Sequence, residues 1–433
     1  MQNFQRWKDY QRKLQRKALG KRLFRQGFWF FPCLLLLGLA TQFSKVDLST
    51  GSLEKSADTS NVLMKKDLRG LIEDPEVLCN GPGGKIHLSY SGNSFSTKTT
   101  LDSSLQAYMS KKIHGSKSPL IGFIAMEPAS GRILSLVDSK KMKGVKSVCL
   151  SSQFPAASIF KIVSAAAAID RCNMSADTKL KYNGRKHTLY KNQLTDRTNR
   201  YTNSVSLKVS FAESINPAFG KLGIFCLKKD LLQKYAVRFG FNQPINFELP
   251  LQPSRTSVDD DPYHWAELAC GFNRETMISP VHGAMMAAAI LNDGKLVEPT
   301  IIEVITDNEN NPVYSGNTRV IRQVLTPKSS REMKELMAAT ISRGTSRRAF
   351  RGFRRDRILK KLLIGGKTGS IKNKSDELLY DWFVGFCAEK AGTRKLALAV
   401  LVVHDKLLRA RAQEYARLAM RHYFKKPSPR GIS

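Results

Sequence analysis

The chain has 433 residues, with 70 Lys and Arg against 36 Asp and Glu, which gives a formal net charge of +34 at pH 7. Because 42% of the residues are hydrophobic, the chain can bury a core, and a disordered polycation is excluded. A strongly basic protein favours either a nucleic acid or a membrane surface as its partner, and the position of the charge decides between them.

The N-terminal part predicts a membrane anchor. Residues 1–26 hold nine Lys or Arg against one Asp, and an uncharged apolar run follows at residues 27–44. A membrane-spanning helix needs about 20 apolar residues, so this run predicts a transmembrane signal anchor in the inner membrane, with a cleaved signal peptide as the alternative. The basic flank predicts a cytoplasmic segment over residues 1–26 and an extracytoplasmic chain after residue 45, which argues against a nucleic-acid partner.

Six cysteines follow the predicted anchor and would face an oxidising space after export. Their pairing is left open by the sequence, because six cysteines allow fifteen connectivities. No CxxC or Cys/His cluster with the spacing of metal ligands occurs, so no metal site is expected.

The rest of the chain predicts a linker, one α+β domain and a tail. Residues 45–94 are polar with Gly and Pro and predict a linker or stalk, residues 95–424 form the domain, and residues 425–433 form the tail. Apolar patterning predicts a helix over residues 101–113, a β-hairpin over 120–139, a helical middle, strands near 362–370, 382–386 and 396–403, and a closing helix over 407–423. Strands at both ends of the domain predict one sheet built from both ends.

A candidate nucleophile lies at the start of a predicted buried helix. Ser158 and Lys161 are three residues apart, so both side chains project from one face. A serine hydroxyl becomes a nucleophile when a base takes its proton, and a lysine can act as that base if burial or a second cation lowers its pKa from about 10.4. The pattern alone is weak evidence, because Ser52 and Lys55 match it too.

Two further short motifs follow in order. Ser214-Ile215-Asn216 supplies a hydroxyl and an amide, and Lys367-Thr368-Gly369 supplies a cation and a hydroxyl on a predicted strand edge. K-T-G occurs once in the chain, whereas S-x-N has other matches. The ordered triple of S-x-x-K, S-x-N and K-T-G resembles the penicillin-binding transpeptidases.

The resemblance covers about residues 95–424. It includes the turn at Glu127–Leu134, the Gly344-Thr345-Ser346 motif and the Asp381–Phe386 stretch after K-T-G. It implies a penicillin-binding and serine β-lactamase-like transpeptidase fold, in which a mainly antiparallel sheet is flanked by helices and joined to a helical subdomain, preceded by one transmembrane helix.

The resemblance also implies a mechanism. Lys161 would take the proton of Ser158, which attacks the carbonyl between the two terminal D-alanines of a peptidoglycan stem peptide. Ser214 would relay a proton to the leaving D-alanine, and Asn216 would orient the peptide. The oxyanion would lie between the backbone N–H groups of Ser158 and Ser370.

The K-T-G strand would bind the terminal carboxylate of the substrate, through Lys367, Thr368, Gly369 and Ser370. A neighbouring stem-peptide amine would then attack the acyl-enzyme and form the cross-link, so no cofactor is implied. β-lactams would acylate the same serine. A D,D-carboxypeptidase, a β-lactamase-like hydrolase and a non-catalytic β-lactam sensor or scaffold are the alternatives.

Two departures from the family pattern stand out. The fifty or so residues after the predicted anchor hold neither a glycosyltransferase domain nor a large pedestal, which puts in doubt a cell-wall synthesis machinery partner that uses the pedestal. The second departure is a basic block at residues 343–361, with nine Lys or Arg against one Asp. It predicts attraction of anionic substrate or lipid headgroups, each basic residue near an acidic membrane contributing up to about 1 kcal/mol, with a solvated loop as the alternative.

Overall fold

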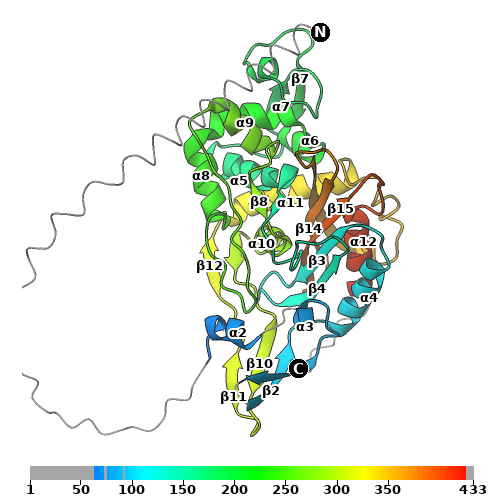
Figure 1. Cartoon of the computed structure of the whole chain (residues 1–433). Coiled ribbons are helices and arrows are strands. Elements are labelled where there is room, and N and C mark those ends of the chain that lie inside the picture. Colours follow the sequence, from blue (N-terminus) through cyan, green and yellow to red (C-terminus); the bar gives the residue numbers. More distant parts are fainter. Residues whose placement is uncertain (1–62, 73–75, 91–92, 426–433) are drawn as a thin grey trace, which may run out of the picture. The chain divides into compact units, whose positions relative to one another are not determined.

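The computed structural model describes residues 63–72, 76–90 and 93–425 (Figure 1). The predicted cytoplasmic segment, the predicted anchor over residues 27–44 and the tail after residue 425 lie outside the described residues. Within the described ranges, every helix is too short or too polar to cross a membrane.

A five-stranded antiparallel sheet lies at the centre, in the order β13-β14-β15-β3-β4 (Figure 1). Its strands are β3 (Leu120–Met126), β4 (Ile133–Lys140), β13 (Leu362–Lys372), β14 (Leu379–Glu389) and β15 (Lys395–His404). Strand β15, near the end of the chain, pairs with β3, with Val400 opposite Phe123. The prediction of one sheet built from both ends of the domain is therefore confirmed.

Both faces of this sheet are covered, which explains the continuous apolar run of β15. Alternate side chains point to opposite faces of a strand. Ala399 and Leu401 belong to one core cluster, whereas Val400 and Val402 belong to the other. A strand buried on both faces has no polar alternation in its sequence.

Helices cover each face. Helix α10 (Pro280–Leu291) lies against β15, β3 and β14 on one face, and α4 (Ser103–His114) and α12 (Ala412–Tyr423) lie against the other. Helix α11 (Pro327–Ser342) contacts β13 and α5 (Lys161–Arg171). All twelve residues of α10 are buried, and its small side chains allow close approach to the strands.

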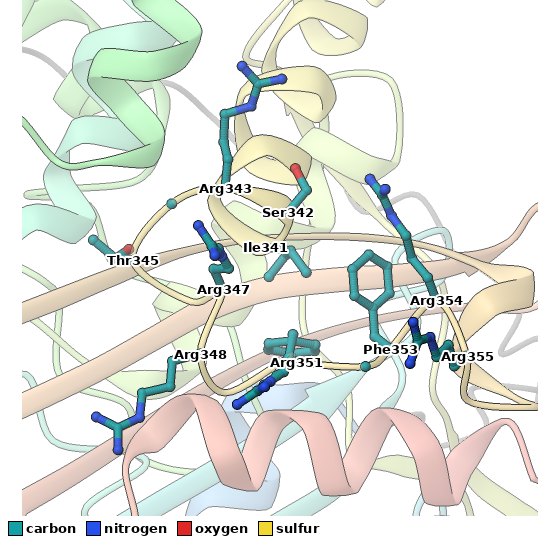
Figure 2. Close-up of a pocket in the computed structure, with 13 residues that line it drawn as sticks. Ile341, Ser342, Arg343, Thr345, Arg347, Arg348, Arg351, Phe353, Arg354 and Arg355 are labelled. Atoms are coloured by element: carbon teal, nitrogen blue, oxygen red, sulfur yellow. The ribbon is translucent and has the colours of Figure 1, made fainter.

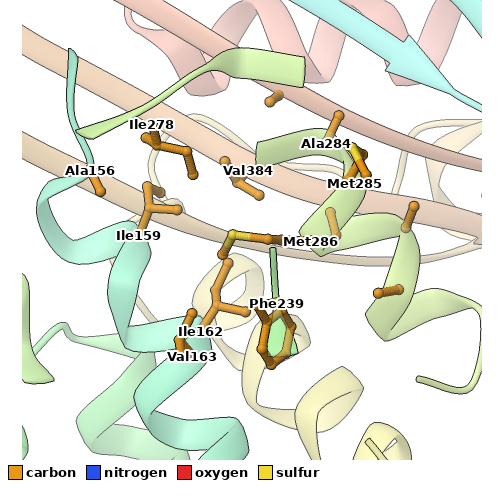
Figure 3. Packing of buried hydrophobic residues seen from close by; sticks show 14 of the residues in the cluster. Ala156, Ile159, Ile162, Val163, Phe239, Ile278, Ala284, Met285, Met286 and Val384 are labelled. Atoms are coloured by element: carbon orange, nitrogen blue, oxygen red, sulfur yellow. The ribbon is translucent and has the colours of Figure 1, made fainter. Parts of the chain in front are cut away.

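The turn that leads into α5 packs against the sheet, and the first turn of α5 lies beside α10. Figure 3 shows Ile159 and Ile162 beside Met286 of α10 and Val384 of β14, all within one buried cluster. The segment that carries Ser158 and Lys161 is therefore held in place by apolar side chains that pack in the main core.

A helical subdomain adjoins the sheet and occupies the upper part of Figure 1. It contains α6 (Leu207–Ala212), α7 (Asn216–Leu222), the π-helical turn η3 (Gly223–Leu227), α8 (Lys228–Arg238) and α9 (Pro262–Cys270), with the hairpin of β6 (Lys179–Tyr182) and β7 (Asn203–Ser206). A disulfide joins Cys172, just after α5, to Cys226. Cys149, Cys270 and Cys387 are buried thiols.

The described part of the predicted linker is folded, which corrects the expectation for residues 63–94. Helices α2 (Lys65–Leu71) and α3 (Glu76–Cys79) precede the hairpin of β1 (Lys85–Tyr90) and β2 (Asn93–Thr99). Leu68 and Leu78 are buried in the main core. The stretch is polar because only one side of each element is covered, so composition alone concealed its structure.

Strand β2 joins this hairpin to a second sheet. The order is β1-β2-β10-β11, with β10 spanning Ile302–Thr306 and β11 spanning Pro312–Ser315. Three two-stranded pairs complete the described part of the fold, formed by β9 (Lys295–Val297) with β12 (Val320–Gln323), β5 (Phe154–Pro155) with β8 (Met277–Ile278), and the β6–β7 hairpin.

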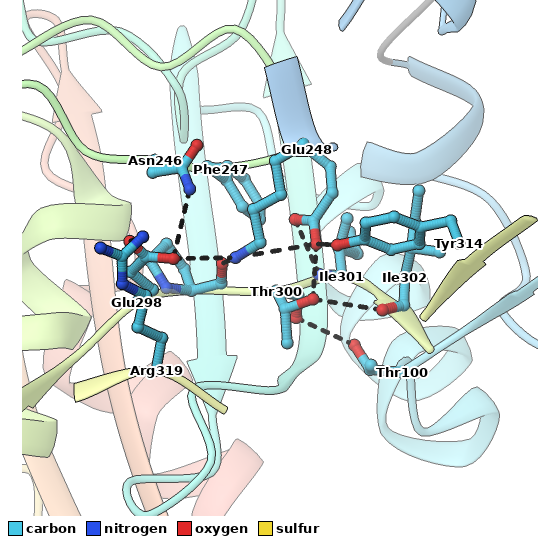
Figure 4. A network of polar contacts seen from close by, with 12 residues as sticks. Thr100, Asn246, Phe247, Glu248, Glu298, Thr300, Ile301, Ile302, Tyr314 and Arg319 are labelled. Carbon is cyan, nitrogen blue, oxygen red and sulfur yellow. Dashed lines mark hydrogen bonds and ion pairs between the residues drawn. The ribbon is translucent and has the colours of Figure 1, made fainter. Parts of the chain in front are cut away.

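A buried polar network lies beside this second sheet. The Glu248 carboxylate accepts hydrogen bonds from Thr300 Oγ1 (2.5 Å) and Tyr314 Oη (2.8 Å), as Figure 4 shows. Lys65 of α2 reaches the same group, with its Nζ 3.9 Å from Glu248 Oε1 and 3.5 Å from Glu298 Oε2. The network thus ties α2 to the domain through opposite charges.

Candidate active site

Ser158 lies in a 3-10 turn, η1 (Ala157–Phe160), that leads directly into α5. The sequence predicted a helix starting near Ser158, and the α-helix itself begins three residues later, at Lys161. In a 3-10 turn the side chains at i and i+3 eclipse each other. This local geometry brings Lys161 Nζ to 3.0 Å from Ser158 Oγ.

Long-range contacts hold the turn before Ser158. Trp382 of β14 is fully buried and donates from Nε1 to the Pro155 carbonyl at 2.9 Å. A Cβ on Gly271 would lie 2.0 Å from the Ala157 carbonyl oxygen, and a Cβ on Gly369 would lie 3.1 Å from Ile159 Cγ1. The glycine of K-T-G therefore allows β13 to lie close against the serine turn.

Lys161 is fully buried and has only neutral hydrogen-bond partners. Besides Ser158, its Nζ donates to Asn216 Oδ1 at 2.8 Å and to the Cys270 carbonyl at 2.5 Å. Burial disfavours the charged form and lowers the pKa of Lys161 to about 8. A substantial fraction of this lysine is therefore neutral near pH 8, as a proton acceptor requires.

Lys367 is the second buried lysine of the site. Its Nζ donates to Ser214 Oγ at 3.0 Å and to the Thr368 carbonyl at 2.8 Å. Burial, and then the charge of Lys161, lower the pKa of Lys367 well below its ordinary value. Ser214 itself has φ +57°, a left-handed conformation that is uncommon for a non-glycine residue.

Two phenylalanine rings form the apolar surroundings of these lysines. Lys161 Nζ lies 5.5 Å from the centroid of the Phe219 ring, and Lys367 Nζ lies 5.6 Å from that of Phe211. Both rings are fully buried, with their centroids 6.3 Å apart. They help to exclude water from the two amines and so contribute to the burial that lowers the pKa of each lysine.

Asn216 is held in a defined orientation at the start of α7. Its Oδ1 accepts from Lys161, and its Nδ2 donates to the His187 carbonyl at 3.2 Å. Each end of the amide thus has a partner, which fixes the direction of its remaining hydrogen-bonding capacity toward the pocket.

The K-T-G strand, β13, forms the edge of the sheet beside Ser158. Thr368 Oγ1 lies 2.6 Å from Thr345 Oγ1, and Ser370 Oγ donates to Asp381 Oδ1 at 3.2 Å. Arg411, just before α12, forms a two-pronged contact with Asp381 at 2.8 and 2.7 Å and donates to Ser370 Oγ at 3.2 Å.

Asp381 and Arg411 were missed as site residues by sequence reasoning. Burial alone raises the pKa of a carboxyl group, but the contacts of His404 and Arg411 outweigh it and hold the pKa of Asp381 below its ordinary value. Asp381 could have been found from the sequence, because it directly precedes Trp382 in the stretch that resembles the family pattern. Nothing in the sequence pointed to Arg411, because its contacts depend on the sheet register that places Ser370 opposite Asp381.

These groups open onto one pocket of about 500 Å³, here called the catalytic pocket. Its lining includes Ser158, Ser214, Asn216, Thr368 and Ser370, while Lys161 and Lys367 lie buried beneath it. With Gly369 of the same strand included, all eight residues predicted from the sequence lie together at this pocket. Within the described ranges, no group of three or more His, Cys, Asp and Glu side chains is arranged to hold a metal ion.

Residues 121–423 match the family model of the penicillin binding protein transpeptidase domain, which is more than half of the chain. The chain belongs to the penicillin-binding protein transpeptidase family. The resemblance inferred from the three motifs is confirmed, and so is the transpeptidase fold.

Relatives and solved structures of this family are distant in sequence. Peptidoglycan D,D-transpeptidase PbpA of Mycolicibacterium smegmatis is 24% identical over 321 residues, covering 64% of this chain and 61% of that protein. Penicillin-binding protein 3 of Bacillus subtilis is 23% identical, covering 80% of this chain and 54% of that protein. This family member thus spans less than two thirds of the length of either relative.

Two solved structures share the fold. The D,D-transpeptidase domain of a peptidoglycan glycosyltransferase from Eggerthella lenta gives a TM-score of 0.61 at 20% identity, covering 76% of this chain and 82% of that one. Penicillin-binding protein A of M. tuberculosis, as an imipenem acyl-enzyme complex, gives a TM-score of 0.60 at 20% identity, covering 76% and 79%. At this identity the likeness establishes the fold.

Proposed function

We propose that this chain is a serine D,D-transpeptidase that cross-links peptidoglycan stem peptides through an acyl-enzyme on Ser158 and is inhibited by β-lactams. The observation that carries the proposal is the 3.0 Å approach of Ser158 Oγ to a fully buried lysine that has no carboxylate partner among the described residues. A nucleophile, a base of lowered pKa and a shaped pocket are the parts that acyl transfer requires.

The first step uses the Ser158–Lys161 pair. Neutral Lys161 takes the hydroxyl proton as Ser158 Oγ bonds to the carbonyl carbon between the two terminal D-alanines. The negative charge that forms on the carbonyl oxygen is held by the backbone N–H groups of Ser158 and Ser370. Each donor of this kind contributes about 3 kcal/mol in comparable sites.

The second step uses Ser214 and Lys367. As the tetrahedral intermediate collapses, the bond to the leaving D-alanine breaks, and its nitrogen takes a proton through Ser214 Oγ. The 3.0 Å contact of Ser214 with Lys367 supports this relay. Asn216, already oriented by its two partners, positions the substrate amide.

The substrate carboxylate is assigned to the outer part of β13. Lys367, Thr368 and Ser370 contribute an amine and two hydroxyls, and Gly369 keeps the strand close to Ser158. Arg411 extends this set, because its guanidinium lines the catalytic pocket and contacts Ser370. An amine of a second stem peptide then attacks the acyl-enzyme, which restores Ser158 and forms the cross-link.

Labelling with a fluorescent penicillin tests the proposal. The wild-type protein is expected to form a covalent adduct, and Ser158→Ala is expected to form none. Ser164→Ala provides a matched control, because Ser164 is a buried serine of the same helix whose Oγ contacts only the Phe160 carbonyl. An adduct that survives Ser158→Ala would refute the proposal, and an adduct that hydrolyses within seconds would indicate a hydrolase instead.

We also propose that residues 27–44 anchor the chain in the inner membrane with the catalytic domain outside. The supporting features are the apolar run and its basic flank at residues 1–26. In membrane fractionation, the full chain is expected in the membrane fraction, and Leu35→Arg with Leu37→Arg is expected to release it. Retention of that double variant in the membrane would contradict the anchor.

A further inference from the structure

An arginine-lined groove lies next to the catalytic pocket. It has a volume of about 1150 Å³, more than twice that of the catalytic pocket, and is lined by the last two residues of α11 and by the loop that follows it, up to Arg355. Figure 2 shows its arginine side chains fanning out from this one loop. Six arginines line this groove, here called the arginine groove: Arg343, Arg347, Arg348, Arg351, Arg354 and Arg355.

The loop is a fixed part of the fold. Phe350 is fully buried and stacks on Phe383 of β14, with ring centroids 6.0 Å apart. Arg417 of α12 donates to the Ala349 carbonyl at 2.7 Å, and Ser346 N donates to the Thr340 carbonyl at 3.1 Å. The guanidinium groups are therefore presented from a supported backbone, as a binding surface requires.

The charge of the arginine groove is left without a counterpart inside the described part of the chain. Asp356 is the one acidic residue of the basic block, and it is already occupied by Arg421 (2.9 Å) and by the backbone N–H groups of Ile358 and Leu359. In the described ranges, no ion pair involves any of the six groove arginines. Like charges held around one hollow repel each other, and a bound anion removes that repulsion.

The residue type indicates the chemistry of the ligand. The lining contains six arginines and no lysine. The planar guanidinium group binds carboxylates and phosphates through two parallel hydrogen bonds, whereas the lysine ammonium acts as a point charge. The arginine groove therefore fits a ligand with several separate oxyanion groups.

The arginine groove adjoins the catalytic pocket. Thr345 lines both, and its hydroxyl contacts Thr368 of the K-T-G motif at 2.6 Å. A ligand that extends from the catalytic pocket past Thr345 reaches the arginine groove. This favours the substrate strand itself over a separate partner.

A lipid surface fits the same residues less well. Membrane-binding surfaces combine basic residues with large apolar side chains that insert among the lipids. Within the described ranges, none of the large exposed apolar side chains belongs to residues 343–361. The hollow shape also suits a chain that lies in it better than a flat bilayer.

We propose that the arginine groove binds the carboxylates of neighbouring stem peptides on an uncross-linked peptidoglycan strand, while one stem peptide of that strand occupies the catalytic pocket. This rests on the proposed transpeptidase function. Each uncross-linked stem peptide ends in a carboxylate. A donor stem loses that carboxylate when its terminal D-alanine is released, whereas the acceptor stem reacts through its amine and keeps its own. The arginine groove thereby favours strands whose donor stems are still intact.

The experiment measures the affinity of the detergent-solubilised full chain for immobilised uncross-linked peptidoglycan strands. The groove variant carries R347Q, R348Q, R351Q, R354Q and R355Q. The matched control carries K66Q, K85Q, K117Q, K143Q and K146Q, which removes the same charge from exposed positions elsewhere. Acylation by benzylpenicillin, measured on every protein, reports whether the Ser158 site is folded.

The wild type and the control variant are expected to bind strands with affinities within about twofold of each other, whereas the groove variant is expected to bind at least about tenfold more weakly. That loss is expected to exceed any loss in acylation rate by at least about fivefold. Amidation of the strand carboxylates is expected to weaken wild-type binding to the level of the groove variant or below it, because the arginine groove and the K-T-G strand both lose their ionic partners.

Three outcomes would overturn the proposal. They are equal strand affinity of the groove and control variants, undiminished binding of amidated strands, and groove-dependent binding to phosphatidylglycerol vesicles or to inorganic polyphosphate that is tighter than binding to strands. A wild-type protein that forms no Ser158 adduct refutes the transpeptidase function instead. Equal affinities alongside a normal adduct refute the arginine groove's role alone.

Discussion

The buried lysines in two regions of this molecule have opposite surroundings. Lys161 beneath the catalytic pocket donates to neutral groups, namely Ser158, Asn216 and the Cys270 carbonyl, and burial lowers its pKa to about 8. Lys65 beside the second sheet lies within 4 Å of Glu248 and Glu298 and donates to the Pro299 carbonyl at 2.8 Å. The same side chain is thus prepared for proton transfer in one place and for holding elements together in the other.

The two sites differ in whether the buried ammonium group has carboxylate partners. A buried ammonium without a carboxylate is destabilised, and it becomes reactive because its proton is easily lost. A buried ammonium between carboxylates compensates their charge. Four variants and conditions test this contrast.

The largest expected effect is on catalysis. Lys161→Met is expected to lower the rate of β-lactam acylation by about 10²- to 10⁴-fold, because Ser158 loses its base. Stopped-flow or gel-based acylation rates measure it. Lys221→Met is the control, since Lys221 is a buried lysine of α7 with an exposed partner, Asp196, and lies outside the site. An acylation rate within threefold of wild type would contradict the role of Lys161.

The second variant affects stability. Lys65→Met is expected to lower the free energy of unfolding by about 3–5 kcal/mol, because Glu248 and Glu298 lose a buried counter-charge. Denaturant unfolding measures the change, with the exposed neighbour variant Lys66→Met as control. A loss below about 1 kcal/mol would indicate that the carboxylates are compensated by other groups.

A smaller loss of stability is expected from Tyr314→Phe. This change removes the 2.8 Å hydrogen bond from Tyr314 to Glu248 and keeps the ring, and a hydrogen bond to a charged group contributes about 1.5–3 kcal/mol. Thermal unfolding measures it. In a double-variant cycle with Lys65→Met the two losses are expected to be non-additive, and strict additivity would argue against one coupled network.

The smallest expected effect is the dependence on pH. Acylation requires neutral Lys161, so its rate is expected to rise about tenfold between pH 7 and pH 9 and to level off above about pH 9, following a pKa of about 8. The unfolded chain also binds a proton that folded Lys161 lacks between about pH 8 and pH 10.5, so this group makes stability rise with pH in that window. A rate that stays flat from pH 6 to pH 9 would contradict the lowered pKa.

The catalytic motifs could be recognised from sequence because their geometry is local or their order along the chain is distinctive. Ser158 and Lys161 meet through one turn, and K-T-G stands on a single strand. The hydrogen bond from Trp382 to Pro155 and the close approach of Gly271 to Ala157 connect segments more than 100 residues apart, which periodicity does not reveal.

Other features were missed either because they depend on contacts between distant segments or because the polar composition of a segment was misleading. The Cys172–Cys226 disulfide could not be chosen from the sequence, because six cysteines allow fifteen connectivities. Residues 63–94 were predicted as a linker because they are polar, although Leu68 and Leu78 complete the core. The basic block could be seen in the sequence as a run of charge. That its arginines line a groove beside the catalytic pocket could not, because this depends on how the loop packs against the sheet through Phe350.

The central sheet, assembled from both ends of the domain, also has a consequence for biosynthesis. Ser158 is translated more than 200 residues before Lys367. Strand β3 can pair with β15 only after β15 has been synthesised. Contacts between such distant segments form slowly during folding, after the loop between them has closed. A nascent or truncated chain therefore holds its nucleophile without its carboxylate-binding strand, and it gains the capacity to be acylated only when synthesis is nearly complete.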